Sequence, residues 1–181
     1  MKGVVFTEFL GLVEQKFSAD MVDDIIDDAD LPHGGAYTAV GTYPFPEMVS
    51  LIVALSKRSG IEVPVLIHAF GQYLFGRFFV LYPAFINACD STIQLVSHIE
   101  QVIHTEVRKL YPDAELPSFE VESHTAQRLA VVYRSPRCLA DLAVGLIDGA
   151  IAHYGEQGRV RLLREPLDAD GKVVRFVLEK T

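Results

Sequence analysis

Among its 181 residues the sequence has no tryptophan and only two cysteines, Cys89 and Cys138. The two cysteines show neither a pairing nor a metal-ligand spacing, so we expect a protein of the reducing cytoplasm without a disulfide framework. Glycine-rich phosphate loops, a His-Glu-x-x-His pair and a serine nucleophile elbow are also missing. Their absence argues against kinases, cyclases and the common hydrolases, and we expect no enzymatic activity.

An excess of positive charge is missing as well. The formal net charge is −8 at pH 7. This argues against general nucleic-acid binding, because that needs clustered lysine and arginine to neutralise phosphates. Six aspartates fall between Asp20 and Asp30. Such a run is most often a solvated helix face, and a docking surface for a basic partner is the alternative.

No hydrophobic run is pure enough to predict a membrane span. The apolar stretch from Val63 to Ile86 contains His68, Gln72 and Arg77. Acidic residues near the N-terminus interrupt any secretory signal. The length suits a single hydrophobic core, so we predict one cytoplasmic domain, residues 1–181.

The hydrophobic period changes from helical to alternating after about two-thirds of the chain. The expected helices cover residues 5–16, 20–29, 47–58, 64–75, 87–110 and 139–154, and the expected strands cover 119–122, 129–133, 160–163 and 173–178. The last two strands form a predicted hairpin that turns at residues 168–171. A mostly helical N-terminal part followed by a small antiparallel sheet predicts an α+β fold. Gly145 and Gly149 would let something flat or bulky pack closely against the last helix.

One short motif follows a histidine at a distance of 29 residues. Tyr133, Ser135 and Arg137 alternate along the sequence Tyr-Arg-Ser-Pro-Arg, so on an extended segment they point to one side. A phenol, a hydroxyl and a guanidinium are three donors that suit a ligand with two carboxylates. His104 lies upstream on a predicted helix and could supply an axial bond to a metal. Taken alone, such a histidine is more often a packed or surface residue, and such a motif is more often a strand that ends in a turn.

Together the histidine and the motif resemble the haem-nitric oxide/oxygen-binding (H-NOX) family, which is related to the haem domain of soluble guanylate cyclase. In that family a Tyr-x-Ser-x-Arg motif holds the haem propionates and a histidine ligates the iron. Tyr133, Ser135 and Arg137 match the motif, and His104 matches the ligand. The N-terminal Met-Lys-Gly and the stretches 69–72 and 116–119 are also similar, so the resemblance covers essentially the whole chain.

The resemblance implies a haem b cofactor held between the helical part and the sheet. Pro117 sits where the family places a proline against the porphyrin face. Six apolar residues match positions that surround the haem, although each is equally explicable as core: Val5, Phe9, Leu74, Phe78, Leu142 and Leu146. The remaining histidines have no second ligand at a recognisable spacing, and we interpret them as structural.

Leu142 carries a prediction about the gas. Oxygen-binding members have a tyrosine at this position, because bound O₂ gains from a hydrogen-bond donor, whereas NO and CO depend on one far less. Leu142, Phe9 and Leu74 donate nothing, so we expect a dry pocket that binds NO and CO and leaves O₂ unbound. An altered helix rotation that brought in the Tyr73 hydroxyl would overturn this expectation.

The resemblance also implies a signalling mechanism. When NO binds, the iron–His104 bond weakens or breaks, and the change in conformation passes to a separate partner, typically a histidine kinase or a cyclic-di-GMP enzyme in bacteria. The alternative is a haem-free interaction or small-molecule-binding module of the same fold. A hydrolase or metalloenzyme is a weaker alternative, because no His-Glu-x-x-His spacing or serine nucleophile elbow is present. A haem peroxidase is also weaker, since the only nearby distal candidate, Arg77, is expected outside the pocket.

Overall fold

Helices form the N-terminal part of the chain and an antiparallel sheet follows them, which confirms the predicted α+β fold. A computed structural model describes all residues, 1–181. The elements are α1 (Gly3–Lys16), α2 (Ala19–Asp28), α3 (Phe45–Ser59), α4 (Val63–Leu81), α5 (Pro83–Asn87), α6 (Thr92–Ser97), the π-helix η1 (Ile99–Ile103), α7 (His104–Leu110), β1 (Ser118–His124), β2 (Arg128–Arg134), α8 (Ala140–His153), β3 (Val160–Pro166) and β4 (Val173–Lys180).

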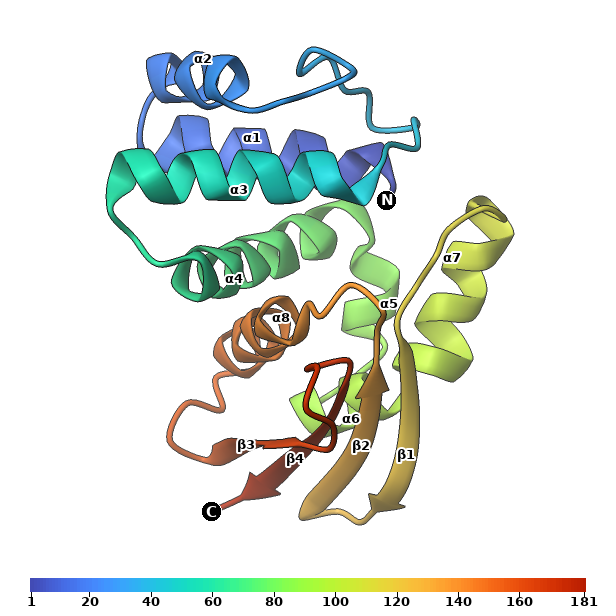
Figure 1. The fold of residues 1–181 in the computed structure, drawn as a ribbon. Coiled ribbons are helices and arrows are strands. Elements are labelled where there is room, and N and C mark those ends of the chain that lie inside the picture. Colours follow the sequence, from blue (N-terminus) through green and yellow to red (C-terminus); the bar gives the residue numbers. More distant parts are fainter.

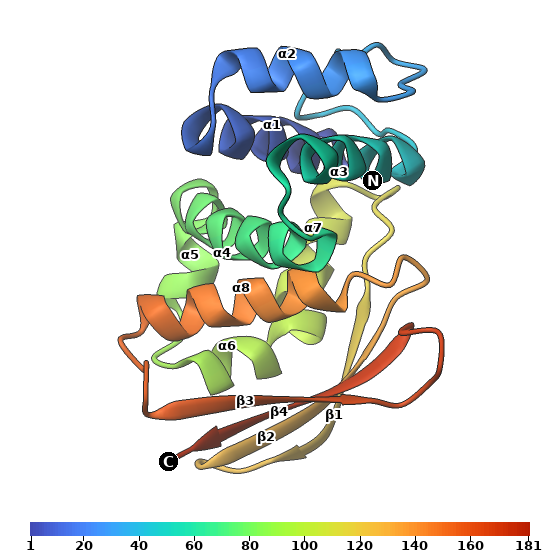
Figure 2. The same ribbon diagram turned by 60° about the vertical axis from the view of Figure 1, so that its left-hand side comes forward.

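The elements are arranged in layers. Helices α1, α2 and α3 lie at one end, α4 and α8 lie in the middle, and the sheet closes the other end (Figure 1). Turning the molecule shows α6 between α8 and the sheet (Figure 2). Helix α7 stands beside β1 (Figure 1). One hydrophobic cluster fills the α1–α3–α4 region, and a second lies between α6, α8 and the sheet.

The sheet has the order β1-β2-β4-β3 with every neighbouring pair antiparallel. The predicted hairpin 160–178 is therefore confirmed as β3 and β4. Leu129, Val131 and Tyr133 alternate along β2 and join the cluster beneath α6 and α8, as the two-residue period of a strand requires. On the opposite face, Arg175 of β4 pairs with Glu122 of β1 and completes a polar cover.

Helices α4 and α8 cross at backbone contact. A Cβ atom on Gly145 would lie 2.1 Å from the carbonyl oxygen of His68, and a Cβ atom on Gly149 would lie 2.7 Å from the Cβ atom of Phe75. The two glycines do admit close packing, as predicted, and the bulky group that they admit is α4. This contact fixes α4 and α8 as one unit beneath the N-terminal helices.

The predicted helix 87–110 is wrong as a single element. The chain leaves the helix after Asn87 and restarts at Ser91, whose Oγ accepts a hydrogen bond of 3.3 Å from the backbone N–H of Gln94. The π-helix Ile99–Ile103 then separates α6 from α7. Hydrophobic periodicity did not show either break, because the apolar residues continue on both sides of them.

Helix α4 extends to Leu81, six residues beyond the predicted end, and is long and apolar enough by length and composition alone to cross a membrane. In the structure it packs against α8, α1 and α3, with Leu66, Phe70 and Leu74 buried. Core helices of soluble proteins can be equally long and apolar, so the length and composition of α4 are weak evidence for a membrane span. The aspartates of α2 are exposed or half-buried, and Asp24 and Asp28 both pair with Arg58 of the neighbouring helix α3.

Candidate haem site

His104 is the first residue of α7 and is buried, with 9% of its surface exposed. The centre of its ring lies 5.8 Å from the centre of the Phe119 ring, in an edge-on arrangement. The centre of the Phe119 ring lies 5.3 Å from that of the Tyr133 ring. Phe119 and Tyr133 are paired residues of β1 and β2. The sheet thus joins the histidine to the first residue of the motif through one aromatic contact chain, which the sequence did not predict.

The imidazole of His104 presents its Nε2 atom without a hydrogen-bond partner. Its Nδ1 atom lies 3.0 Å from Oε2 of Glu100, one turn earlier. An ionised carboxylate only accepts hydrogen bonds, so Nδ1 carries the proton and Nε2 keeps the lone pair. Burial lowers the pKa of His104, against the opposing effect of Glu100, and the neutral ring that results is the form that ligates a metal.

Glu100 is ionised although it is half-buried. Burial alone raises the pKa of its carboxyl, but hydrogen bonds from Arg108, His104 and the Phe119 amide outweigh that effect, and the pKa lies below its usual range. The Arg108 guanidinium donates to Oε1 at 2.8 Å, and the Phe119 N–H donates to Oε2 at 3.2 Å. Sequence reasoning missed this role, although the spacing of four residues between Glu100 and His104 was visible.

The Tyr-x-Ser-x-Arg motif straddles the end of β2. Tyr133 and Ser135 are buried, while the strand ends at Arg134 and a turn at Pro136 carries Arg137. Only Tyr133 therefore lies within the strand, and the predicted alternation does not continue to Arg137. The Ser135 Oγ accepts the backbone N–H of Arg137 at 3.2 Å, which ties the third member to the second.

The Arg137 side chain is half-buried and contacts two residues, Glu115 and Phe45, in ways that the sequence did not predict. Its guanidinium donates to the backbone carbonyl of Glu115 at 3.1 Å and also pairs with the Glu115 carboxylate. It stands 5.6 Å from the centre of the Phe45 ring at the start of α3. Pro117 is half-buried in the same connection between α7 and β1. No sequence signal pointed to Glu115.

The six apolar residues predicted around the haem come from three helices and meet in one hydrophobic cluster. Phe9 of α1 and Leu74 of α4 are buried members of that cluster. The other four pack against it as partly buried residues: Val5, Phe78, Leu142 and Leu146. The structure therefore brings together the predicted apolar set, on α1, α4 and α8, while His104 and Tyr133 belong to the α7 and sheet side.

Tyr73 and Arg77 point toward α1. Arg77 Nε donates to Oε2 of Glu8 at 2.7 Å. The Tyr73 hydroxyl lies 3.4 Å from the position that a Cβ atom would occupy if Gly11 carried one. Burial and the nearby Glu8 raise the pKa of Tyr73. Both polar side chains are thus directed at the Glu8–Gly11 side of α1, whereas the predicted lining residues of α1 are Val5 and Phe9.

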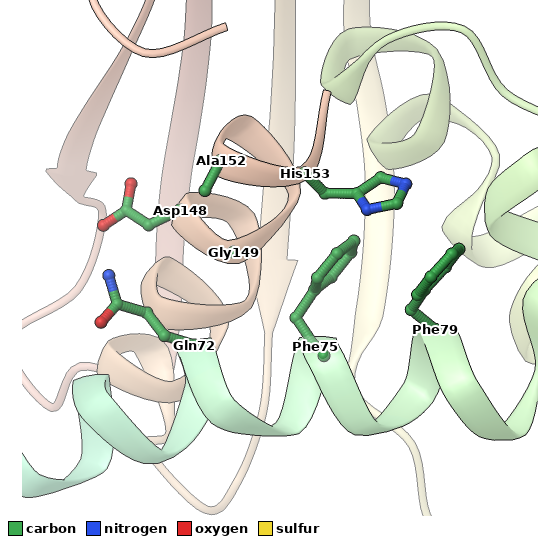
Figure 3. Close-up of a pocket in the computed structure, with 8 residues that line it drawn as sticks. Gln72, Phe75, Phe79, Asp148, Gly149, Ala152 and His153 are labelled. Carbon is green, nitrogen blue, oxygen red and sulfur yellow. The ribbon is translucent and has the colours of Figure 1, made fainter. Parts of the chain in front are cut away.

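A surface hollow between α4 and α8 is a different place. Gln72 and Asp148 lie at one end of it, and His153 faces Phe75 and Phe79 at the other (Figure 3). None of the residues predicted to hold haem lines it. The chain also has no group of three or more His, Cys, Asp or Glu side chains that would hold a metal ion. The single buried histidine fits haem, since the porphyrin supplies the other iron ligands.

The sequence profile of the haem-NO-binding (HNOB) family matches residues 2–162. This chain belongs to that family. H-NOX proteins are haem-based gas sensors, and membership supports a haem cofactor for this chain. No curated protein sequence matches it.

Solved H-NOX structures share the fold over the whole chain. The Fe(II) unliganded protein from K. algicida is 38% identical with a TM-score of 0.93 and is covered over 97% of its length. The S. oneidensis protein in the Fe(II)NO state is 25% identical with a TM-score of 0.90 and is covered over 99%. The Shewanella woodyi protein, bound to IWP-051 in the Fe(II)CO state, is 34% identical with a TM-score of 0.85 and is covered over 95%. Each comparison covers 100% of this chain.

Proposed function

We propose that this protein is a nitric oxide sensor that binds NO and CO, but not O₂, at ferrous haem b and signals to a separate protein. The observation that carries the proposal is His104: a buried, neutral imidazole with Nδ1 held by Glu100 and Nε2 free. It belongs to a chain of the haem-NO-binding family and is joined to the propionate motif by Phe119.

Each part of the site has an assigned task. His104 would ligate the haem iron, and Tyr133, Ser135 and Arg137 would hold the two propionates. Pro117 would contact the porphyrin on the His104 side. The opposite face is lined by the apolar residues already named: Val5, Phe9, Leu74, Phe78, Leu142 and Leu146. When bound, the ferrous haem supplies the iron atom on which the gas binds.

Selectivity follows from the absence of a donor on the gas side. Phe9, Leu74 and Leu142 have no polar side-chain atoms, and the Tyr73 hydroxyl is directed at the Glu8–Gly11 side of α1. O₂ on iron needs a hydrogen bond more than NO or CO does. The test is to reduce the protein without oxygen and then admit air: a stable oxy spectrum would contradict this selectivity.

The signal is the response of α7 to NO. With haem bound, weakening of the bond between His104 and the iron would free α7 and its neighbour β1 to adopt a second arrangement that the partner would recognise. Gas binding moves such an equilibrium only as far as NO prefers one state over the other. A histidine kinase or a cyclic-di-GMP enzyme is the proposed partner. We place the protein in the bacterial cytoplasm, which is supported by two free cysteines and bacterial relatives.

Haem binding by histidine variants tests the assignment of His104. His104→Ala should lose stable haem or bind it only with added imidazole. His98→Ala is the matched control, because His98 contacts Cys89 Sγ at 3.7 Å rather than the site, and it should keep the wild-type spectrum. If the wild type itself took up no haem, the haem-free binding module would replace the sensor.

A further inference from the structure

The π-helix Ile99–Ile103 lies immediately before His104. A π-turn widens the helix locally, and such turns occur mostly at functional sites. Glu100 belongs to this π-helix, and its carboxylate reaches Nδ1 of His104 at 3.0 Å. The irregular turn therefore positions an acidic group behind the imidazole that would face the iron.

The Glu100 carboxylate is itself fixed from three sides. Oε1 receives Arg108 from α7 at 2.8 Å, and Oε2 receives both His104 and the backbone N–H of Phe119 in β1. The Phe119 ring also packs against the His104 imidazole. Glu100 thus connects the histidine with the first strand of the sheet through bonds that do not involve the cofactor.

We propose that Glu100 is a positioning residue that controls how strongly His104 binds the haem iron, an inference that rests on the proposed function. The carboxylate fixes the Nδ1–H tautomer and makes Nε2 a better donor, because a hydrogen-bonded carboxylate raises the basicity of a ligating imidazole. A stronger donor favours Fe(III) over Fe(II) and resists the loss of the iron–histidine bond. Glu100 therefore sets how readily NO binding releases His104.

Glu100 also affects the state in which His104 no longer binds the iron. When His104 leaves the iron, its Nδ1–H keeps the carboxylate as a partner, and that carboxylate is anchored to Phe119 and Arg108. The free imidazole is then retained beside β1 and can rebind. The same anchor transmits a displacement of His104 to the start of the sheet.

The first test uses the haem-free wild-type protein and needs no variant. Nitrogen NMR of the His104 ring should show the proton on Nδ1 and the lone pair on Nε2 at neutral pH. A proton on Nε2 would overturn the role of Glu100. This result does not depend on haem uptake, so it stands even if the sensor function fails.

The second test compares Glu100→Gln with the wild-type holoprotein, and Glu106→Gln is the matched control. Glu106 is an acidic residue of α7 that pairs with Lys109 away from His104. In Glu100→Gln we expect a lower iron–histidine stretching frequency, a larger five-coordinate share of the NO complex and a higher reduction potential. A tenfold loss of the preference for Fe(III) equals an upward shift of about 59 mV for a one-electron couple. Glu106→Gln should match the wild type. An unchanged stretching frequency in Glu100→Gln would contradict the proposal, whereas absence of haem in the wild type would contradict the sensor function instead.

Discussion

Gly145 of α8 lies directly against the backbone of His68 in α4, so closely that a Cβ atom there would stand 2.1 Å from the His68 carbonyl oxygen. A carbonyl oxygen in a helix cannot move aside as the end of a flexible side chain can. The distance between α4 and α8 therefore depends on this glycine, and with it the position of Leu142 and Leu146, three residues earlier and one residue later on α8.

Gly145→Ala should destabilise the protein by about 1–3 kcal/mol, the usual cost of overpacking a filled interior. The matched control is Gly76→Ala on the exposed side of α4, where a Cβ atom meets nothing within 4 Å. That change should be neutral or stabilising by up to about 1 kcal/mol, since alanine is the better helix residue. Urea unfolding of both variants measures the difference, and equal stabilities would show that the helix contact yields easily.

Leu142→Tyr should allow the ferrous protein to hold O₂. A hydroxyl directed at the bound gas adds a hydrogen bond of about 1–2 kcal/mol, which slows O₂ release by roughly tenfold. Leu142→Phe adds a ring without the hydroxyl and serves as the control. Stopped-flow spectra after mixing with oxygenated buffer would separate the two. A gain of O₂ binding in both variants would attribute the effect to pocket shape.

Arg137→Gln should weaken haem binding by about tenfold or more, because charge-assisted hydrogen bonds contribute about 1.5–3 kcal/mol. Its neighbour Arg134 is exposed and pairs with Glu120, so Arg134→Gln should bind haem as the wild type does. Glu115→Gln removes the carboxylate that holds Arg137 and should leave the guanidinium free for a propionate. Transfer of haem to apomyoglobin gives the three affinities. A weaker Arg134→Gln variant would assign the effect to overall charge.

The lowered pKa of Glu47 predicts that the protein loses stability in acid. Burial raises the pKa of this buried carboxyl, but hydrogen bonds from His33 and Tyr37 outweigh that effect and hold the pKa below its ordinary value of 4.5. A depressed carboxyl pKa stabilises the fold above the unfolded pKa, and this contribution disappears as pH falls through the lower folded value. Glu47→Gln should flatten the stability curve below about pH 4.5, whereas Glu14→Gln on the exposed side of α1 should keep the slope of the wild type.

The sequence predicted those parts of the fold and site that local pattern determines. Periodicity identified α1, α3, α8 and the final hairpin, and the motif with its upstream histidine indicated the family. The break at Ser91 was not predicted although the polar residues Asp90 and Ser91 are a helix-start signal. The π-helix before His104 was not predicted because apolar residues continue on both sides of it. The contact between Glu115 and Arg137 was not predicted for another reason: it joins residues 22 positions apart and depends on a turn. The haem contacts of the predicted residues remain predictions.

The absorption spectrum of the reduced protein, prepared without oxygen and recorded before and after addition of NO, tests the central claim most directly. We predict a high-spin ferrous Soret band that shifts on NO addition to that of a five-coordinate complex, the sign that His104 has left the iron. A six-coordinate complex would keep the sensor but remove bond rupture from its mechanism. A protein without a Soret band after reconstitution with haem would contradict the account.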